Sequence, residues 1–255
     1  MTYEELITQA RTLIDDKRHD EAIAVCDQAI QLDPNGAAAY FHRGFSYLEK
    51  EDLDRALADC TEAIRLDPAY TKAYNIRAML YVYKGEFEKA AADYSEVIRL
   101  DPTNAKAYCN RGCAYSEKGD YESAIADFAH ALELDPRDAK TYYNRGLAYA
   151  NKGDADTAIV DYTEAVRIDP AYTDAYSNRG LIHAQNGDLD KAIEDYTKTI
   201  SIDPKRAWVY YNRGNAYFSK DDYDNAISDY TQAIELDSEL AKAYPRQVLR
   251  RKRRP

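Results

Sequence analysis

Residues 105–138 read AKAYCNRGCAYSEKGDYESAIADFAHALELDPRD, and the same pattern recurs along the chain every 34 residues. The recurrence is clearest at the dipeptide Asp135-Pro136. It is found again at Asp33-Pro34, Asp67-Pro68, Asp101-Pro102, Asp169-Pro170 and Asp203-Pro204. A period of this length is typical of a repeat array, in which each unit buries its apolar face only against its neighbours. The sequence therefore predicts one elongated array, with no domain boundary inside residues 3–240.

Each unit of the array reads as two helices. In residues 105–138, apolar or small residues recur three or four positions apart in each half. They are Tyr108, Gly112 and Tyr115 in the first half and Ala124, Phe128 and Ala131 in the second. This spacing places each set on one helical stripe. Between the halves, Lys118-Gly119-Asp120 predicts a turn, because glycine tolerates the left-handed conformation that ends a helix and aspartate can cap the next one.

Polar residues mark the expected helix starts. The Asp-Pro pair ends each unit, since proline lacks an amide hydrogen and disfavours helical geometry in the residue before it. The next helix then needs an N-cap, and we assign that role to Thr71, Asn104, Asp138 and Thr173. Every second helix also carries an acidic residue near its start, where the helix dipole favours an anion. These residues are Asp20, Asp54, Glu88, Glu122, Asp156, Asp190 and Asp224.

These residues resemble the tetratricopeptide repeat, a helix-turn-helix unit of 34 residues that ends in a proline. The fifth unit carries the family's large, small and aromatic positions as Tyr142, Gly146, Tyr149, Ala158, Tyr162, Ala165 and Pro170. The resemblance implies an all-α fold, a right-handed α-α superhelix of the TPR solenoid type. The seven expected units are residues 3–36, 37–70, 71–104, 105–138, 139–172, 173–206 and 207–240. We expect residues 241–255 to form a capping helix with a basic tail.

The charge of the chain is unevenly distributed. The formal net charge is -11, and residues 241–255 carry seven basic residues and no acidic one, which leaves -18 for the rest. An acidic body disfavours nucleic acid, because affinity for phosphate comes mainly from lysine and arginine. We therefore expect contact with nucleic acid or an anionic membrane only through the basic tail.

The sequence favours a cytoplasmic protein without a cofactor. No stretch is apolar for long enough to span a membrane, and the start MTYEELITQA is acidic where a secretory signal would be basic and then apolar. The four cysteines are irregularly spaced, which fits a reducing compartment. Cys109 and Cys113 lie four residues apart, but two thiols do not make a tetrahedral metal site. Because no motif resembles a nucleophile with its base or a phosphate loop, we expect no enzyme activity, no metal and no small-molecule substrate.

An unusual pair of charged residues recurs in the packing register. Arginines stand next to the packing glycine, where the family more often has leucine. They are Arg43, Arg77, Arg111, Arg145, Arg179 and Arg213. Aspartates follow each of them by 16 residues, and the first unit, with Gln9 and Val25 at these positions, lacks both members together. We interpret the pattern as an Arg to Asp contact inside each unit.

A row of asparagines is the first candidate site. In the superhelices of this family the first helices of successive units line a concave groove. Asn110, Asn144, Asn178 and Asn212 occupy one position of four consecutive first helices. The row resembles the asparagine ladder of O-linked N-acetylglucosamine transferase and related peptide-binding arrays. Each side-chain amide offers a donor and an acceptor, which suits a peptide backbone; the alternative is that the asparagines bond their own helix or meet solvent.

Large side chains near this row change from unit to unit. Phe41, Phe45 and Met79 make the N-terminal part of the expected groove apolar. Tyr143, Tyr211 and Trp208 bring aromatic groups to the C-terminal part. Partly exposed aromatic groups beside hydrogen-bonding groups are typical of binding hot spots, although some of these side chains could equally be buried between neighbouring helices.

Taken with the resemblance, this pattern predicts a non-enzymatic adaptor for protein-protein interaction. The asparagines would hold the backbone of an extended partner peptide, and the aromatic groups would select its side chains. The alternative is a self-assembling scaffold, a homo-oligomer in which the basic tail contacts the acidic body of a neighbour.

Overall fold

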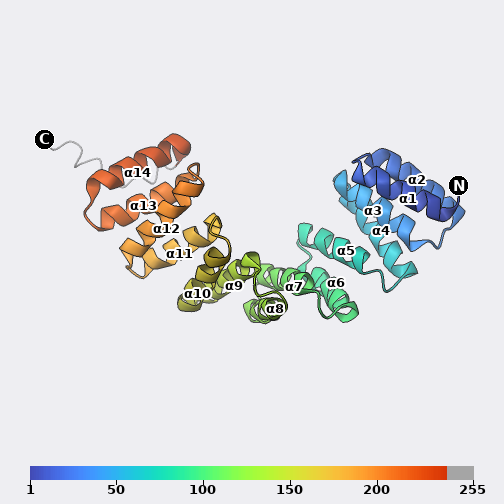
Figure 1. The fold of residues 1–255 in the computed structure, drawn as a ribbon, viewed down its shortest axis with the longest axis horizontal. Coiled ribbons are helices and arrows are strands. Elements are labelled where there is room, and N and C mark those ends of the chain that lie inside the picture. Colours follow the sequence, from blue (N-terminus) through green and yellow to red (C-terminus); the bar gives the residue numbers. More distant parts are fainter. Residues whose placement is uncertain (240–255) are drawn as a thin grey trace. The chain divides into compact units, whose positions relative to one another are not determined.

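The computed structural model describes residues 1–239 as helices joined by short turns (Figure 1). Fourteen helices are found in this part of the chain, and it contains no strand. They are α1 (Tyr3–Asp15), α2 (His19–Leu32), α3 (Ala37–Glu49), α4 (Leu53–Leu66), α5 (Thr71–Tyr83), α6 (Phe87–Leu100), α7 (Ala105–Lys118), α8 (Tyr121–Leu134), α9 (Ala139–Lys152), α10 (Ala155–Ile168), α11 (Thr173–Gln185), α12 (Leu189–Ile202), α13 (Ala207–Ser219) and α14 (Tyr223–Leu236). The predicted all-α fold is confirmed. The expected capping helix and basic tail lie outside the described residues.

The helices divide into two compact units. The N-terminal unit is Met1–Pro136 and contains α1 to α8, and the C-terminal unit begins at Arg137 and contains α9 to α14. The sequence pattern, which is continuous through this point, predicted no such division.

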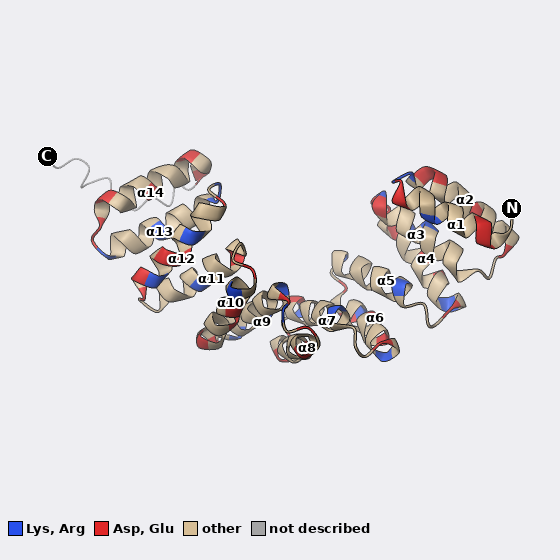
Figure 2. Ribbon diagram, in the orientation of Figure 1, with Lys and Arg blue, Asp and Glu red and all other residues tan. Residues whose placement is uncertain are grey.

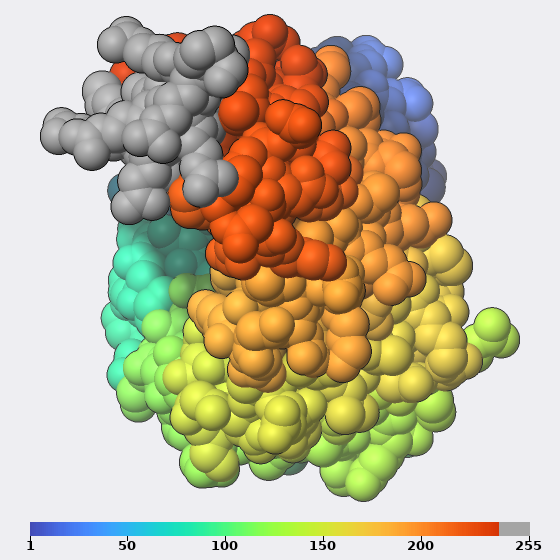
Figure 3. All heavy atoms as spheres, turned by 90° about the vertical axis from the view of Figure 1, so that its left-hand side faces the viewer, coloured from blue at the N-terminus to red at the C-terminus, as the bar shows by residue number. Residues whose placement is uncertain are grey.

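Within each helix pair, a small residue of the first helix lets the second helix approach closely. A Cβ atom added to Gly112 of α7 would lie 2.8 Å from Cε1 of Phe128 on α8. Gly146 stands in the same relation to Tyr162, also at 2.8 Å. The aromatic rings thereby become fully buried, as Tyr196 also is. Side chains of α13 and α14 (orange to red) lie directly against those of the preceding helices (Figure 3).

The turn inside each helix pair has the predicted geometry. Gly119 ends α7 with a left-handed φ of 85°, and the Asp120 side chain caps α8 by accepting from the Ser123 backbone N–H at 3.2 Å. The same repeat position is also left-handed where it is not glycine, at Lys17, Glu51 and Asp221. Acidic residues (red) stand near many helix starts (Figure 2).

Two of the four predicted N-caps between helix pairs are wrong. Asn104 and Asp138 do cap α7 and α9. Thr71 and Thr173, however, are the first residues inside α5 and α11, and tyrosines 70 and 172 occupy the cap positions without a side-chain bond. The Asp-Pro turn explains the shift, because its aspartate carbonyl accepts from the backbone N–H three residues later and fixes that residue as the cap.

The predicted Arg to Asp contact is confirmed in all six units that have both residues. In each, Nε and one Nη of the arginine donate to both carboxylate oxygens of the aspartate, at 2.6–2.9 Å. The hydrogen bonds to the aspartate raise the pKa of each guanidinium. In five units the remaining nitrogen also bonds a side chain on the second helix of the preceding unit: Asp27, Thr61, Ser95, Thr163 or Thr197. The arginine therefore joins three helices.

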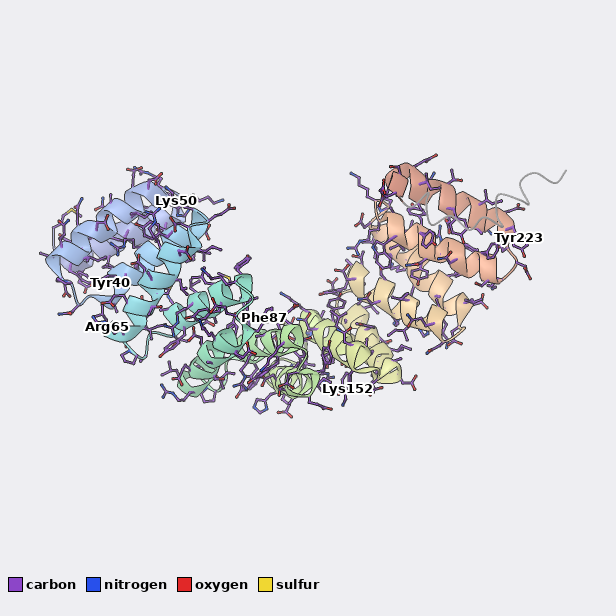
Figure 4. All side chains as sticks on the ribbon, turned by 180° about the vertical axis from the view of Figure 1, so that it is seen from behind. Tyr40, Lys50, Arg65, Phe87, Lys152 and Tyr223 are labelled. Carbon is purple, nitrogen blue, oxygen red and sulfur yellow. The ribbon has the colours of Figure 1, made fainter. Side chains whose placement is uncertain are left out.

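A second, exposed set of ion pairs links successive helix pairs. Lys50 at the end of α3 pairs with Asp20 of α2 (Figure 4 labels Lys50). Lys84 pairs with Asp54 at 2.5 Å, and Lys118 lies 3.1 Å from Glu88. The acidic residues at the starts of the second helices thus also contact the next repeat. Exposed pairs of this kind contribute at most about 1 kcal/mol each.

Candidate functional site

The predicted site residues all lie on first helices of the repeats, but some belong to the N-terminal unit and the others to the C-terminal unit. Phe41 and Phe45 of α3, Met79 of α5 and Asn110 of α7 belong to the N-terminal unit. Tyr143 and Asn144 of α9, Asn178 of α11, and Trp208, Tyr211 and Asn212 of α13 belong to the C-terminal unit. The predicted site residues therefore form two separate groups, one in each unit.

In the N-terminal unit, Phe41 is part of the core. It is only 8% exposed and its ring lies 5.1 Å from that of Tyr70 and 6.5 Å from that of Phe45. Phe45 is half-buried. Phe41 therefore supports the surface around it and does not offer its own ring to a ligand.

A hollow of about 630 Å³ lies beside Met79 in the N-terminal unit. Leu48, Leu53 and Met79 give it apolar walls, and Tyr83, whose side chain is 70% exposed, stands at its edge. Glu49 and Glu51 add two carboxylates. The sequence pattern singled out Met79 here but missed both glutamates, which looked like ordinary solvated residues at a helix end.

In the C-terminal unit, Asn178 bonds a neighbouring tyrosine. Its amide nitrogen donates to the hydroxyl of Tyr143 at 3.1 Å. The Tyr143 ring lies between Tyr162 and Tyr172, at 5.8 and 5.1 Å, and burial raises the pKa of its hydroxyl. In the structure Asn178 thus holds an aromatic group of the preceding repeat in place.

Asn110 and Asn212 differ from Asn178 in their bonding. Both are half-buried, and neither side-chain amide has a hydrogen-bond partner within residues 1–239. Asn144 is also half-buried. The row therefore contains at least two amides whose donor and acceptor remain available.

Around Asn212 the surface of α13 is partly aromatic. Trp208, one turn earlier, is 38% exposed, and Tyr211 lies 5.7 Å from the ring of Tyr230. Asn212 itself lines a hollow of about 260 Å³ together with Asn215 of α13 and Tyr196 of α12. The sequence pattern named Asn212 but gave no reason to single out Tyr196, which stands at the same repeat position as Tyr162 of the fifth unit.

The described residues contain little chemistry of other kinds. Residues 1–239 hold no cluster of three or more His, Cys, Asp or Glu side chains that could bind a metal ion. None of the four cysteines, all of which lie in residues 1–239, forms a disulfide bond, and burial raises the pKa of Cys26 and Cys60 to about 12. None of the described helices is both long and apolar enough to cross a membrane.

Models of one protein family match most of the chain. A model described as TPR repeat matches residues 10–51, 78–119, 113–153, 148–187 and 180–221. A model described as Tetratricopeptide repeat matches residues 37–70 and 207–240. No curated protein matches the chain.

Several solved structures are similar to the chain in fold. MamA protein is 32% identical, with a TM-score of 0.61, over 69% of this chain and 96% of that one. YrrB, described as a TPR protein with an unusual peptide-binding site, is 26% identical, with a TM-score of 0.59, over 76% of this chain and 98% of that one. The C-terminal part of a TPR repeat-containing protein from Cytophaga hutchinsonii is 19% identical, with a TM-score of 0.77, over 95% of this chain and 98% of that one. The last likeness concerns the fold alone.

Proposed function

The chain belongs to the tetratricopeptide repeat family, and on that premise we propose that it is a non-enzymatic adaptor that binds an extended peptide of a partner protein along its first helices. The fold and its similarity to MamA and YrrB suggest protein-protein interaction in general. The peptide, its position and the residues that hold it are our proposal.

The observation that carries this proposal is the unpaired amide of Asn212. A half-buried amide with no partner in the described part of the chain can exchange two hydrogen bonds with one peptide group. The exposed face of Trp208 stands one turn away on the same helix. Amide and aromatic groups together fit a peptide backbone and an adjacent side chain better than they fit a small reactive substrate.

The same logic applies separately to the N-terminal unit. Asn110 also has an unpaired amide, and Met79 forms part of the apolar wall of the 630 Å³ hollow. We propose that each unit offers its own contact with a partner peptide. The four cysteines, none of which forms a disulfide bond, support the proposed location in the cytoplasm, where thiols stay reduced.

Peptide selection followed by point variants tests the proposal. Peptides selected from a random display library on the full chain are measured by fluorescence anisotropy against wild type, Asn212→Ala and Asn110→Ala. Loss of two hydrogen bonds should weaken binding by about tenfold in at least one variant. Asn225→Ala is the matched control, because Asn225 lies on the second helix α14 and bonds Asp222. Equal affinity for all four proteins, or no selected peptide at all, would overturn the proposal.

One observation favours a second candidate, the self-assembling scaffold. The N-terminal hollow combines apolar walls with Glu49, Glu51 and the exposed ring of Tyr83, a set that fits the stem and charge of a basic side chain. Residues 250–254 of a second copy supply such side chains. Sedimentation should then show assembly that weakens as salt rises and is lost in a Glu49→Gln/Glu51→Gln variant. A monomer at low salt excludes this candidate.

A further inference from the structure

The hollow beside α13 contains a buried hydroxyl group without a partner. Tyr196 is fully buried, and its hydroxyl makes no hydrogen bond within the described residues. It lines the 260 Å³ hollow together with Leu181 and Asn212. A buried O–H group in this state costs free energy until an acceptor reaches it, which makes the hollow a candidate binding site.

The two neighbouring repeats show where this hydroxyl points. Tyr230, the equivalent residue of the next repeat, donates to Oδ1 of Asn215 in its own repeat at 2.7 Å. At Tyr162, the equivalent of the preceding repeat, the side chain of Asn178 in the repeat that follows partly offsets the rise that burial causes in the pKa of the hydroxyl, so the two groups lie close together. For Tyr196 the same two positions are Leu181, which has no acceptor, and Asn212, which is not bonded to it. Leu181, Asn212 and Tyr196 all line the hollow, so the two positions at which the hydroxyl would find a partner lie in its wall.

The other polar groups of the hollow add further donors. Because Oδ1 of Asn215 accepts from Tyr230, the amide is oriented and its NH2 group is left as a donor. Asn212 offers one donor and one acceptor. Leu181 and Leu189 supply apolar walls, and no charged side chain of the described chain lines the hollow.

We propose that this hollow is a subsite for a carboxamide side chain, preferably glutamine, of a bound peptide; the inference rests on the proposed function. The carboxamide oxygen accepts from Tyr196 or Asn215, and its NH2 group donates to Oδ1 of Asn212. The two methylene groups of glutamine pack against Leu181 and Leu189.

Other side chains fit the hollow less well. An aliphatic side chain leaves the Tyr196 hydroxyl unpaired. A carboxylate cannot donate to Asn212 and meets no cation in the hollow, inside a chain whose first 240 residues carry a charge of -18. Of these three classes of side chain, the carboxamide alone uses both the donors and the acceptor without adding charge.

The experiment uses peptides selected on the full chain by random display. We expect glutamine or asparagine to be enriched at one position. Synthetic versions with glutamine, glutamate or leucine there are measured against wild type, Tyr196→Phe and the control Tyr162→Phe. Wild type and Tyr162→Phe should prefer glutamine about tenfold over both alternatives, and Tyr196→Phe should reduce that preference to about twofold.

The outcomes separate the subsite from the wider proposal. If selected peptides depend on Asn212 or Asn110 but show no carboxamide preference, or keep it in Tyr196→Phe, the subsite is refuted and peptide binding stands. If no selected peptide depends on either asparagine, peptide binding itself fails and the subsite fails with it.

Discussion

Arg179 and Asp195 form a two-pronged ion pair that is almost entirely buried. Nε and Nη2 of the arginine lie 2.9 and 2.6 Å from the two carboxylate oxygens, and the side chains are 16% and 5% exposed. Nη1 donates to Oγ1 of Thr163 at 2.9 Å, and the ring of Tyr176 lies 5.5 Å from the guanidinium. One side chain thus fixes the relative positions of α10, α11 and α12.

Breaking this pair from either side should be costly, and the two losses should not add in full. Arg179→Leu leaves the Asp195 carboxylate buried without a cation, and should lower the free energy of unfolding by about 3 kcal/mol. Asp195→Leu should act similarly. The double variant places leucine at both positions and should recover at least about 1 kcal/mol of the summed losses. Urea unfolding followed by circular dichroism measures all three.

A distant pair provides the control for this cycle. Asp229 bonds Arg213 and makes no bond to Arg179, so Arg179→Leu and Asp229→Leu should have additive effects. If the Arg179 and Asp195 effects are equally additive, the ion pair does not stabilise the repeat as a unit.

At the left-handed position of the turn inside each helix pair, introducing glycine should raise the stability of the protein and removing glycine should lower it. Glu51 is held at a left-handed φ of 61°, where glycine is free of steric cost, so Glu51→Gly should stabilise the protein by about 0.5–1 kcal/mol. Gly119→Ala should destabilise it by about 1 kcal/mol, although nothing lies within 4 Å of the added Cβ. Thermal unfolding of both variants checks the signs, and a loss of stability in Glu51→Gly would contradict the conformational argument.

Much of this architecture could be predicted because each feature is repeated in the sequence. The Arg to Asp pair was visible since both residues keep the interval and both are missing from the first unit. The additional bond from Arg179 to Thr163 was not predicted, although a hydroxyl residue also recurs at positions 61, 95 and 197. The prediction that Thr71 is an N-cap was wrong, because a good capping side chain determines a helix start less strongly than the turn at Asp67 does. The carbonyl of Asp67 accepts from the backbone N–H of residue 70 at 3.0 Å.

The candidate site was harder to predict, because it depends on differences between repeats. Tyr162, Tyr196 and Tyr230 are equivalent in sequence and equally buried. Of the three hydroxyl groups, only that of Tyr196 is fully buried without a hydrogen-bond partner, and we attribute this to the residues at positions 181 and 212 on two other helices. A repeat pattern identifies the position of a side chain but not which neighbours its polar atoms reach.

Equivalent tyrosines should therefore differ in the effect of losing the hydroxyl. Tyr196→Phe removes an unpaired buried O–H group and should raise the free energy of unfolding of the peptide-free protein by about 1 kcal/mol. Tyr230→Phe breaks the bond to Asn215 and should lower it by about the same amount. Urea titration of both variants beside wild type gives the comparison. Equal losses in the two would mean that Tyr196 has a partner in solution.

His42 should make the protein sensitive to mild acid. Burial, aided by the charges of Arg11 and Lys72 and opposed by Asp15, lowers its pKa to about 4 from an ordinary value near 6.5. As the pH falls below 6.5 the unfolded chain binds a proton that the folded protein refuses, so the stability that is fully present above pH 6.5 is lost progressively down to pH 4.

This sensitivity should disappear when the imidazole is removed. Between pH 7.5 and 4.5 the histidine should account for about 2–3 kcal/mol of lost stability. The variant His42→Ile, which carries the residue found at the equivalent position 76, should lose correspondingly less than wild type over the same interval. His130→Gln, at an exposed site on α8, should behave like wild type. Urea unfolding at the two pH values measures these losses, and carboxylate protonation cancels from the comparison because it acts alike in all three proteins. Equal losses in wild type and His42→Ile would show that His42 is protonated in the folded state.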